Sequence, residues 1–401
     1  MHLLKLSTLF GVFFLLLSCN PKPTETPTEL PQTIDRNLLE QRLATISQKA
    51  IQDLKKLPFD SLQIPRSLKE DGALDARKSK QWTSGFYPGI LWQLAGLDNN
   101  PDLVNGATQW IQPIEKEKLD SGTHDLGFKI YCSFGNAYQV TQKEEYKDIF
   151  ITAAQTLSTR YNPTVGAIRS WDHNRDKWDF PVIIDNMMNL ELLFEVAELT
   201  DDSTIWNIAE QHARTTLKNH FRADNSSYHV IDYNPETGAV RKRNTHQGAS
   251  HESAWSRGQA WGLYGFTVVY RYTKDPVFLA KAEEIADYIF NHPNLPEDLI
   301  PYWDYDAPNI PDEPRDVSAA TVTASGLIEL SQYNPEKAPT YLAWADQILL
   351  SLEKDTYQTT AVPFFLKHSV GSVPGGSEVD VPIIYADYYY VEALKRRLAS
   401  L

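Results

Sequence analysis

The chain has 401 residues, of which 42% are apolar and 11% aromatic, and its formal net charge at pH 7 is −14. A chain of this size and composition buries a sizeable core, and its acidic balance, with no stretch rich in Lys and Arg, excludes nucleic acid as a partner. The same charge leaves room for a small anionic substrate, which needs only local positive groups. The ten Trp and twenty Tyr residues suit sugar stacking as well as core packing.

Residues 1–19 resemble the signal peptide of a bacterial lipoprotein. Lys5 supplies a positive charge, residues 6–17 form an apolar run, and the segment ends with LLSC at Cys19. A run of about a dozen apolar residues is too short to span a bilayer as a helix. We expect Cys19 to be lipidated and to become the mature N-terminus, with a conventional cleaved signal peptide as the alternative. Asn20 favours sorting to the outer membrane, which predicts an exported protein anchored by lipid in the periplasm or outer membrane of a diderm bacterium.

Residues 20–34, which begin with NPKPTETPTELPQT, are rich in Pro and Thr and predict an extended tether without a core. Residues 35–401 are then expected to fold as one domain. Cys132 is the only other cysteine, so no disulfide is expected despite the predicted export.

Twelve helices are predicted in this domain, because apolar residues recur at spacings of three and four. One set is charged and conventionally amphipathic, as in PVFLAKAEEIADYIF, whereas the other is rich in Gly, small residues and Trp, as in SAWSRGQAWGLYGF. Gly inside a helix costs roughly 1 kcal/mol relative to Ala, so its repeated use indicates helices that pack very closely. Alternating inner and outer helices in six antiparallel pairs predict an all-α fold, the (α/α)6 toroid. The predicted helices span residues 36–56, 82–96, 102–116, 124–142, 145–160, 186–199, 203–220, 254–272, 276–291, 316–332, 338–355 and 383–398.

The inner helices of such a toroid run parallel, so their N-termini open on one face. Their dipoles add partial positive charge there, which suits a carboxylate ligand. Residues 227–248 alternate between apolar and polar around an NPETG turn and predict a β-hairpin that leads into the next inner helix. Residues 167–180 form a similar loop. The residues expected at the inner N-termini are Trp82, Thr83, His124, Asp125, Asp185, Asn186, Trp255, Arg257, Arg315 and Asp316.

Asp185 directly follows an apolar run, residues 182–184, that should be buried at the entrance to a helix. Asp125 likewise begins an inner helix. Paired carboxylates are the usual means of acting on sugars, since one gives a proton while the other positions water or charge. The alternative role for both residues is an N-cap, in which the carboxylate accepts hydrogen bonds from free backbone N–H groups.

Arg257 and Trp261 are four residues apart and therefore share one face of their helix. An Arg beside a Trp can pair with a carboxylate above a stacking ring, although core packing is the alternative for the neighbouring Trp255. No Gly-rich phosphate loop, G-x-S-x-G motif or H-E-x-x-H motif occurs, and the histidines are scattered. We therefore expect no metal site and no cofactor.

Long motifs run in order from about Gln81 to the C-terminus: WTSGFYPGILW, HDLGF, DNMMNLELL, HQG with SAWSRGQAWGLYG, PYWDYDAP with RDVSAA and ASGL, and EVDVPIIYADYYYVEAL. With these motifs the chain resembles glycoside hydrolase family 88, the unsaturated glucuronyl hydrolases. The resemblance implies the (α/α)6 toroid and removal of a 4,5-unsaturated glucuronic acid from the non-reducing end of oligosaccharides released by polysaccharide lyases. It also implies hydration of the C4=C5 vinyl ether in place of direct displacement of the glycosidic oxygen.

By this resemblance, Asp185 is the general acid and base that protonates C4 and activates the water attacking C5. Asp125 is the second essential carboxylate, which holds ring hydroxyls and supports the developing charge. The residues that match the sugar-binding cleft of the family are Trp82, His124, Trp171, His229, Thr245, His246, Gln247, Trp255, Arg257 and Trp261.

The second sugar of the substrate is less defined. By the same resemblance, family members that accept sulfated chondroitin disaccharides carry an Arg and, much later in the chain, the pattern Ser-x-x-Ser-x-Lys. Here His246 stands in place of the Arg, Ser369 and Ser372 match the serines as candidate contacts, and Pro374 replaces the Lys. These replacements argue against sulfate specificity of that type, and leave unsulfated glycosaminoglycan, heparin, ulvan and gellan fragments as candidates.

Two alternatives remain at the level of the sequence. The unsaturated rhamnogalacturonyl hydrolases share the toroid and the chemistry, although HDLGF together with SAWSRGQAW favours the glucuronyl group. The other alternative is a non-catalytic, glycan-binding lipoprotein of the outer membrane, which lipidation and Trp content also fit. No feature of the sequence indicates an obligate protein partner.

Overall fold

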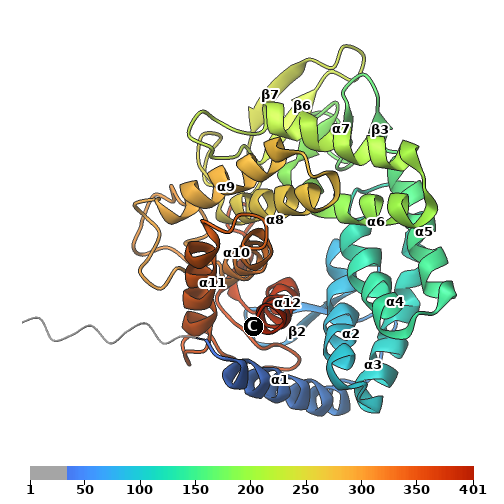
Figure 1. The fold of residues 1–401 in the computed structure, drawn as a ribbon, viewed down its shortest axis with the longest axis vertical. Helices are drawn as coiled ribbons and strands as arrows, with labels where there is room; N and C mark the ends of the chain where they lie inside the picture. Colours follow the sequence, from blue (N-terminus) through green and yellow to red (C-terminus); the bar gives the residue numbers. More distant parts are fainter. Residues whose placement is uncertain (1–33) are drawn as a thin grey trace, which may run out of the picture. The chain divides into compact units, whose positions relative to one another are not determined.

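Helices surround a common axis in the computed structural model of the protein, which describes residues 34–401 (Figure 1). The expected signal peptide, its lipidation site Cys19 and the tether up to residue 33 lie outside the described residues. They stay predictions. No helix in the described part combines the length and the hydropathy that crossing a lipid bilayer requires.

The described helices form an inner and an outer ring, as the sequence predicts (Figure 1). The inner helices are α2 (Phe86–Asp98), α4 (Asn136–Thr141), α6 (Leu190–Thr200), α8 (Ser256–Thr273), α10 (Val317–Leu330) and α12 (Ile384–Ala399). The outer helices are α1 (Arg36–Lys56), α3 (Pro101–Ile111), α5 (Glu144–Ser158), α7 (Ser203–Asn219), α9 (Pro276–Phe290) and α11 (Ala338–Leu352). The fold is the (α/α)6 toroid, and each predicted helix has its counterpart.

Several helices are extended by turns of different pitch: η1 (Trp82–Gly85), η2 (Gln112–Leu119), η3 (Gly127–Gly135) and η4 (Ile184–Asn189). The segment η3 is a π-helix rather than the first part of one continuous α-helix, and such segments are rare and concentrate at functional sites. Its first turn lies against η4, because the Phe128 N–H donates to Asn189 Oδ1 over 3.1 Å. A side chain on Gly127 would collide with Asn189.

Glycines allow the inner helices to approach one another, as their repeated use predicts. A Cβ atom on Gly85 would collide with the carbonyl oxygen of Phe128, and one on Gly89 with that of Cys132. These contacts are made with the neighbouring backbone, which cannot move away as a flexible side chain could. The cost of Gly in a helix is therefore accepted in exchange for a tightly closed inner ring.

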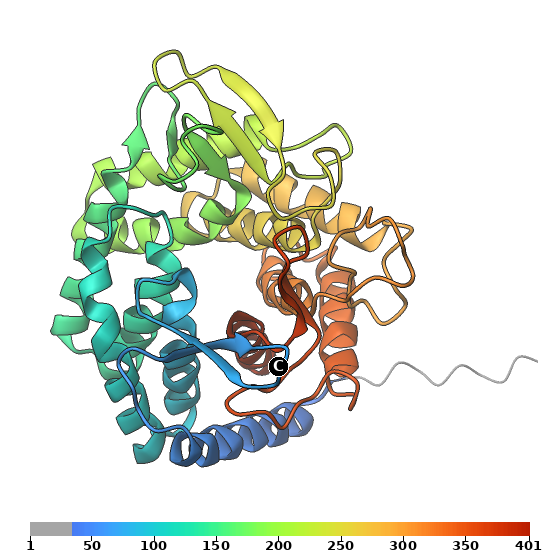
Figure 2. The ribbon, with the colours of Figure 1, turned by 180° about the vertical axis from the view of Figure 1, so that it is seen from behind.

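Short antiparallel sheets lie on the face where the inner helices begin (Figure 2). In Figure 2 the blue and the dark red hairpins cross the opening of the ring, and the green and yellow strands lie at its rim. The predicted hairpin of residues 227–248 forms, and a third strand joins it through the pair Val182 and Ile231. The strands are β1 (Ile64–Leu68) with β2 (Leu74–Arg77), β3 (Tyr161–Asn162) with β4 (Ala167–Ile168), β5 (Pro181–Ile183) with β6 (Val230–Tyr233) and β7 (Val240–Asn244), and β8 (Ser369–Ser372) with β9 (Ser377–Val381).

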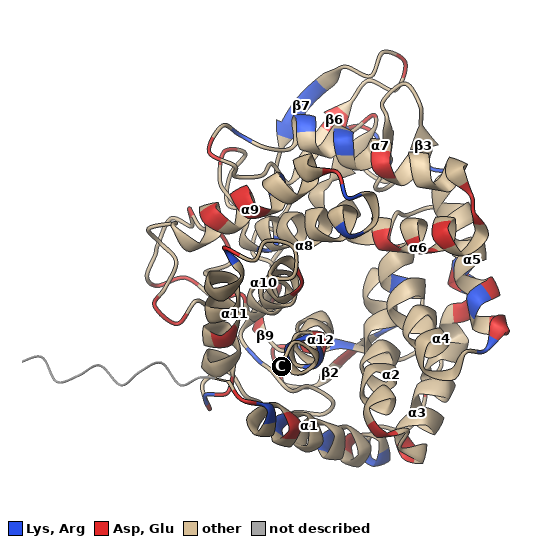
Figure 3. Ribbon diagram, in the orientation of Figure 1, with Lys and Arg blue, Asp and Glu red and all other residues tan. Residues whose placement is uncertain are grey.

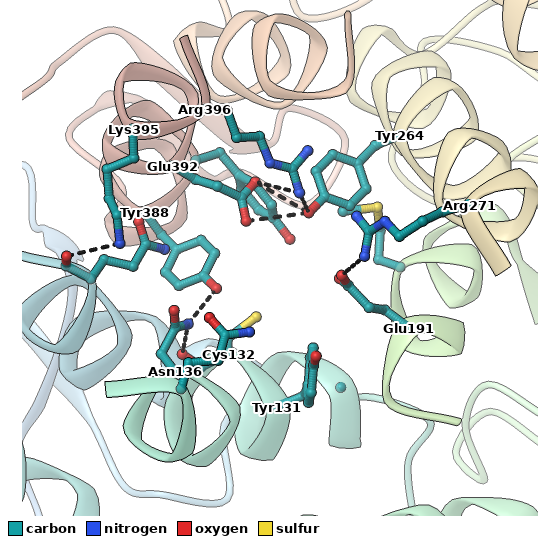
Figure 4. Close-up of a pocket in the computed structure, with 15 residues that line it drawn as sticks. Tyr131, Cys132, Asn136, Glu191, Tyr264, Arg271, Tyr388, Glu392, Lys395 and Arg396 are labelled. Carbon is teal, nitrogen blue, oxygen red and sulfur yellow. Dashed lines mark hydrogen bonds and ion pairs between the residues drawn. The ribbon is translucent and has the colours of Figure 1, made fainter. Parts of the chain in front are cut away.

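A polar cavity of about 260 Å³ lies on the axis toward the C-terminal ends of the inner helices (Figure 4). Beside it, Glu329 accepts a hydrogen bond from Arg271 over 2.7 Å and pairs with Arg396 at 3.0 Å. Burial alone would raise the pKa of Glu329, but the two guanidinium groups lower this pKa to about 2. These ion pairs join α8, α10 and α12.

We expect Glu329→Gln to lower the free energy of unfolding by about 1–3 kcal/mol near neutral pH, because Arg271 and Arg396 lose the carboxylate they share and keep only Glu191 and Glu392, respectively. The folded-state pKa of Glu329 lies below its usual value of 4.5, so its stabilisation is complete above that value and is lost as the pH falls toward about 2. Denaturant unfolding at several pH values measures both effects, with Glu336→Gln on the exposed surface as the matched control. A difference below about 1 kcal/mol from that control at neutral pH would contradict the assignment.

Candidate active site

A cleft of about 400 Å³ opens at the mouth of the toroid, among the N-termini of the inner helices and the β-hairpins. The cleft brings together residues that lie far apart in the sequence. Those that the sequence analysis predicted and that line it are Trp82, His124, Asp125, Trp171, Asp185, His246, Gln247, Arg257 and Ser372.

Asp185 reaches the cleft because an apolar strand ends directly before it. Residues 182–184 are buried, as predicted, and β5 pairs with β6 through them. The Ile184 N–H donates to the His229 carbonyl over 3.1 Å, and η4 then begins. The carboxylate of Asp185 does not cap this helix, since η4 has no side-chain cap, so the capping role is wrong.

One oxygen of Asp185 is buried without a hydrogen-bond partner. Within residues 34–401, Oδ2 accepts no hydrogen bond, and its nearest charged or titratable contact is His229 Nε2 at 3.7 Å. A buried carboxylate without partners is costly to ionise. Asp185 is therefore poised to hold a proton.

Burial beside its apolar neighbours raises the pKa of Asp185 to about 6. His124 and Arg257 work against this rise, and the like charge of Asp125 adds to it. Burial is the largest of these effects, as expected for a carboxylic acid that acts as a proton donor.

Asp125 has the opposite environment. The Thr123 hydroxyl donates to Oδ2 over 2.5 Å, and His124 Nε2 lies 3.2 Å from Oδ1. Burial would raise the pKa of Asp125, but His124, Thr123 and the more distant Lys129 together hold it below its usual value. Asp125 is not an N-cap either, because η3 has no side-chain cap. The pKa values of the two carboxylates are thus shifted in opposite directions, a pattern that recurs in acid–base active sites.

Arg257 lies in the wall of the cleft with most of its donors already engaged. Its guanidinium pairs with Asp316 over 2.7 Å, donates to the Gly371 carbonyl over 2.7 Å, and also donates to the carbonyl of Val370. It lies 4.5 Å from the ring of Trp255. Arg257 therefore ties α8 to α10 and β8, in addition to placing positive charge beside Asp185.

The predicted pairing of Arg257 with Trp261 is wrong. Trp261 is fully buried, and its ring packs against Phe128 and Tyr389 at 5.4 and 5.7 Å. Spacing along a helix places two residues on one face, but it does not decide whether that face meets the cleft or the next helix. The Arg257 guanidinium lies instead over the rings of Trp255 and Tyr385, at 4.5 and 5.4 Å from their centres.

Four further predicted residues are not part of the cleft lining. His229, Trp255 and Ser369 are buried behind it, and Thr245 is half-buried. His229 Nδ1 accepts the N–H groups of His246 and Gln247 over 3.1 and 3.0 Å, so it holds the hairpin end in place. Burial and nearby positive groups lower the pKa of His229 well below its usual value, which keeps the ring neutral. The Thr245 hydroxyl accepts the N–H of Gly248 over 2.7 Å. A direct contact of these four residues with substrate stays a prediction.

The sequence analysis missed several residues of the cleft, among them Thr123, Ser170 and His173. The His173 ring stacks on Trp171 at 5.2 Å, and Ser170 Oγ accepts the N–H of Ile183 over 2.9 Å. Thr123 has a recognisable signal, a hydroxyl two residues before an essential carboxylate. The contacts of Ser170 and His173 depend on how their loop folds, so no local sequence pattern predicts them.

Comparison with known proteins identifies the family. The family model described as Glycosyl Hydrolase Family 88 matches residues 63–294, and an unsaturated glucuronyl hydrolase of Formosa agariphila is 44% identical over 98% of this chain and 98% of its own length. The chain belongs to glycoside hydrolase family 88. The enzyme class expected from the sequence, a glycoside hydrolase, is confirmed.

Solved structures of the family share the fold. A crystal structure described as an unsaturated glucuronyl hydrolase specific for heparin aligns with a TM-score of 0.86 and 44% identity, over 90% of this chain and 99% of that one. An unsaturated glucuronyl hydrolase of Streptococcus agalactiae, a mutant complexed with dGlcA-GalNAc6S, aligns with a TM-score of 0.77 and 29% identity, over 92% of this chain and 93% of that one.

We expect Arg257→Lys to destabilise the fold as well as the site, because Lys cannot hold Asp316 and the carbonyls of residues 370 and 371 at once. The loss of charge-assisted hydrogen bonds lowers the free energy of unfolding by about 1–3 kcal/mol, measured by denaturant titration. Arg36→Lys, on the exposed face of α1, is the control. An unchanged stability with a raised KM would instead assign Arg257 to the substrate alone.

Proposed function

We propose that the protein removes the 4,5-unsaturated glucuronic acid from the non-reducing end of lyase-generated oligosaccharides by hydrating its C4=C5 double bond. The observation that carries this proposal is the pairing of a buried Asp185, whose pKa is raised to about 6, with an Asp125 that stays ionised in one cleft. Membership of family 88 and the glucuronyl hydrolases among its relatives support the same substrate class.

In the first step, protonated Asp185 donates its proton to C4 of the unsaturated ring, which leaves positive charge shared between C5 and the ring oxygen. The Asp185 carboxylate then accepts a proton from water as the water oxygen bonds to C5. The resulting hemiketal opens and expels the remaining sugar. Asp185 ends the cycle protonated, so one group serves as acid and as base.

Asp125 binds hydroxyl groups of the ring and stabilises the developing positive charge through its own negative charge. Trp171, which is partly exposed beside the cleft, offers a face for stacking on the sugar ring. The charge of Arg257 and the N-termini of the inner helices favour the substrate carboxylate nearby. His246, Gln247 and Ser372 line the cleft where the second sugar can reach them.

The alternatives raised by the sequence have less support. The relatives are named as glucuronyl or chondroitin disaccharide hydrolases, which favours the glucuronyl group over the rhamnogalacturonyl one. A non-catalytic glycan-binding lipoprotein has no need for two carboxylates with separated pKa values.

We also propose that the protein is exported and lipid-anchored through Cys19 in a diderm bacterium. The support is the LLSC segment and the Pro/Thr tether in the sequence. Incorporation of labelled fatty acid, lost in Cys19→Ser, is the measurement that tests this location.

We expect Asp185→Asn to fold and bind substrate but to lose about 10²–10⁴-fold in kcat, the contribution of a positioned general acid. The loss of ultraviolet absorbance from the C4=C5 bond measures turnover directly. Because the ionised Asp185 is buried without a partner for Oδ2, the variant should be at least as stable as the natural protein. Retention of kcat near the natural value in the folded variant would sink the assignment.

We expect the rate to fall as the pH rises through about 6, because Asp185 must carry its proton to protonate carbon and its pKa lies there. Asp125, whose pKa is lowered, remains ionised throughout this range. The rate should therefore be level on the mildly acidic side and decline toward alkaline pH. A kcat/KM profile that instead rises through neutral pH would contradict an acid role for Asp185.

A further inference from the structure

A second, larger hollow of about 960 Å³ adjoins the catalytic cleft. The residues common to both are Trp82, Gly122, Thr123, Asp125 and His173. We call this hollow the basic groove, because it is also lined by Arg77, Lys78 and Lys80, at the end of β2 and in the turn that follows. A sugar seated against Asp125 therefore has the basic groove directly beside it.

Three acidic residues line the basic groove, and two of them, Asp120 and Asp172, have a Lys or Arg partner, whereas the third, Asp125, faces the catalytic cleft. Asp120 accepts a hydrogen bond from Lys129 over 2.7 Å, and Asp172 pairs with Arg160 at 3.1 Å and with Arg169. For both residues burial would raise the pKa, but these contacts hold it below the usual value. Asp172 is thus paired with cations outside the groove lining, whereas Asp120 shares Lys129 with Glu117 and is also influenced by Lys80 of the lining.

The lysines of the basic groove are held less closely, although Lys80 lies near enough to Asp120 to help lower the pKa of that carboxylate. Lys78 and Lys80 are exposed, and neither forms an ion pair within the part of the chain that the structure describes. Arg77 is held by Asp75 at 2.9 Å, and Gly122 contributes no side chain between the lysines and Asp125. The amino groups of Lys78 and Lys80 therefore place exposed positive charge beside the cleft of a chain whose formal net charge is −14.

Basic residues elsewhere at the mouth are arranged differently. Figure 3 shows a run of Lys and Arg on β7, but Arg241 of this strand is paired with Asp179 and Asp232. The residues expected for sulfate recognition by family resemblance are also altered, since His246 and Pro374 replace the cations. Any anionic group on the substrate must therefore find its cation elsewhere.

We propose that the basic groove, through Lys78 and Lys80, binds an anionic group of the substrate other than the carboxylate of the unsaturated ring. This inference rests on the proposed function and names its substrate class, an oligosaccharide that carries a sulfate ester or a further uronate. Flexible lysines act as point charges and accept either group, in contrast to the planar fork of Arg.

The test compares Lys78→Gln/Lys80→Gln with the natural enzyme on an unsulfated disaccharide, sulfated disaccharides and an unsulfated tetrasaccharide with a second uronate. The sulfated disaccharides carry their ester either on the unsaturated ring or on the second sugar. For the anionic substrate that uses the groove, KM should rise about five- to tenfold. This is the fold-change expected when the binding free energies of two exposed charge contacts are both lost. The kcat on every substrate, and KM on the unsulfated disaccharide, should change less than about twofold. The substrate whose KM responds identifies the anion bound.

Lys218→Gln/Lys354→Gln is the matched control, because it removes two exposed lysines from outside the groove and changes the net charge equally. A second measurement uses the natural enzyme alone. Raising the salt to about 0.5 M should weaken its binding of the substrate whose KM rises in the double variant, since salt at this concentration screens the attraction between exposed charges within a few ångströms. Equal effects of the two double variants, or an unchanged KM on all anionic substrates, would overturn the inference. Natural enzyme that turns over no unsaturated disaccharide would instead refute the proposed function, and the inference with it.

Discussion

The close approach of the inner helices is the constraint on which the rest of this structure depends. Glycines let η1 and α2 lie against the backbone of η3, and η3 in turn lies against η4 through Asn189. A ring closed in this way holds the inner helices parallel, so that their first turns meet at one mouth. Asp125 and Asp185 come from neighbouring inner segments and share one cleft for this reason.

The same closure creates the electrical difference between the two carboxylates. Asp185 follows a buried strand, and one of its oxygens has no hydrogen-bond partner. Asp125 follows a loop whose last residues supply a hydroxyl and an imidazole to its carboxylate. Neither environment requires a special residue, since burial raises one pKa and hydrogen bonds lower the other. The chemistry follows from where each helix begins.

Buried charge is used for stability and for function in separate regions of the toroid. Toward the C-terminal ends of the inner helices, Arg271 and Arg396 share Glu329, which joins three helices. Arg271 also pairs with Glu191, and Arg396 with Glu392. At the mouth, Arg257 is partly neutralised by Asp316, so its charge still reaches Asp185. Lys78 and Lys80 of the basic groove are exposed and form no ion pair among residues 34–401. That difference is why the groove, and not the axial cavity of Figure 4, is assigned to a ligand.

The sequence by itself determined the helices, their inner and outer roles and the two carboxylates, because helix periodicity, Gly content and the long family motifs are local properties. Only the tertiary structure decided that Trp261 packs in the core, that Arg257 is engaged by residues 59 to 114 positions away, and that His229 acts from behind the cleft. Such contacts join segments distant in the chain, and a helix face carries no mark of which neighbour it meets. The difference between the pKa values of Asp125 and Asp185 is likewise decided by the tertiary structure, since burial and these hydrogen bonds exist only after the ring has closed.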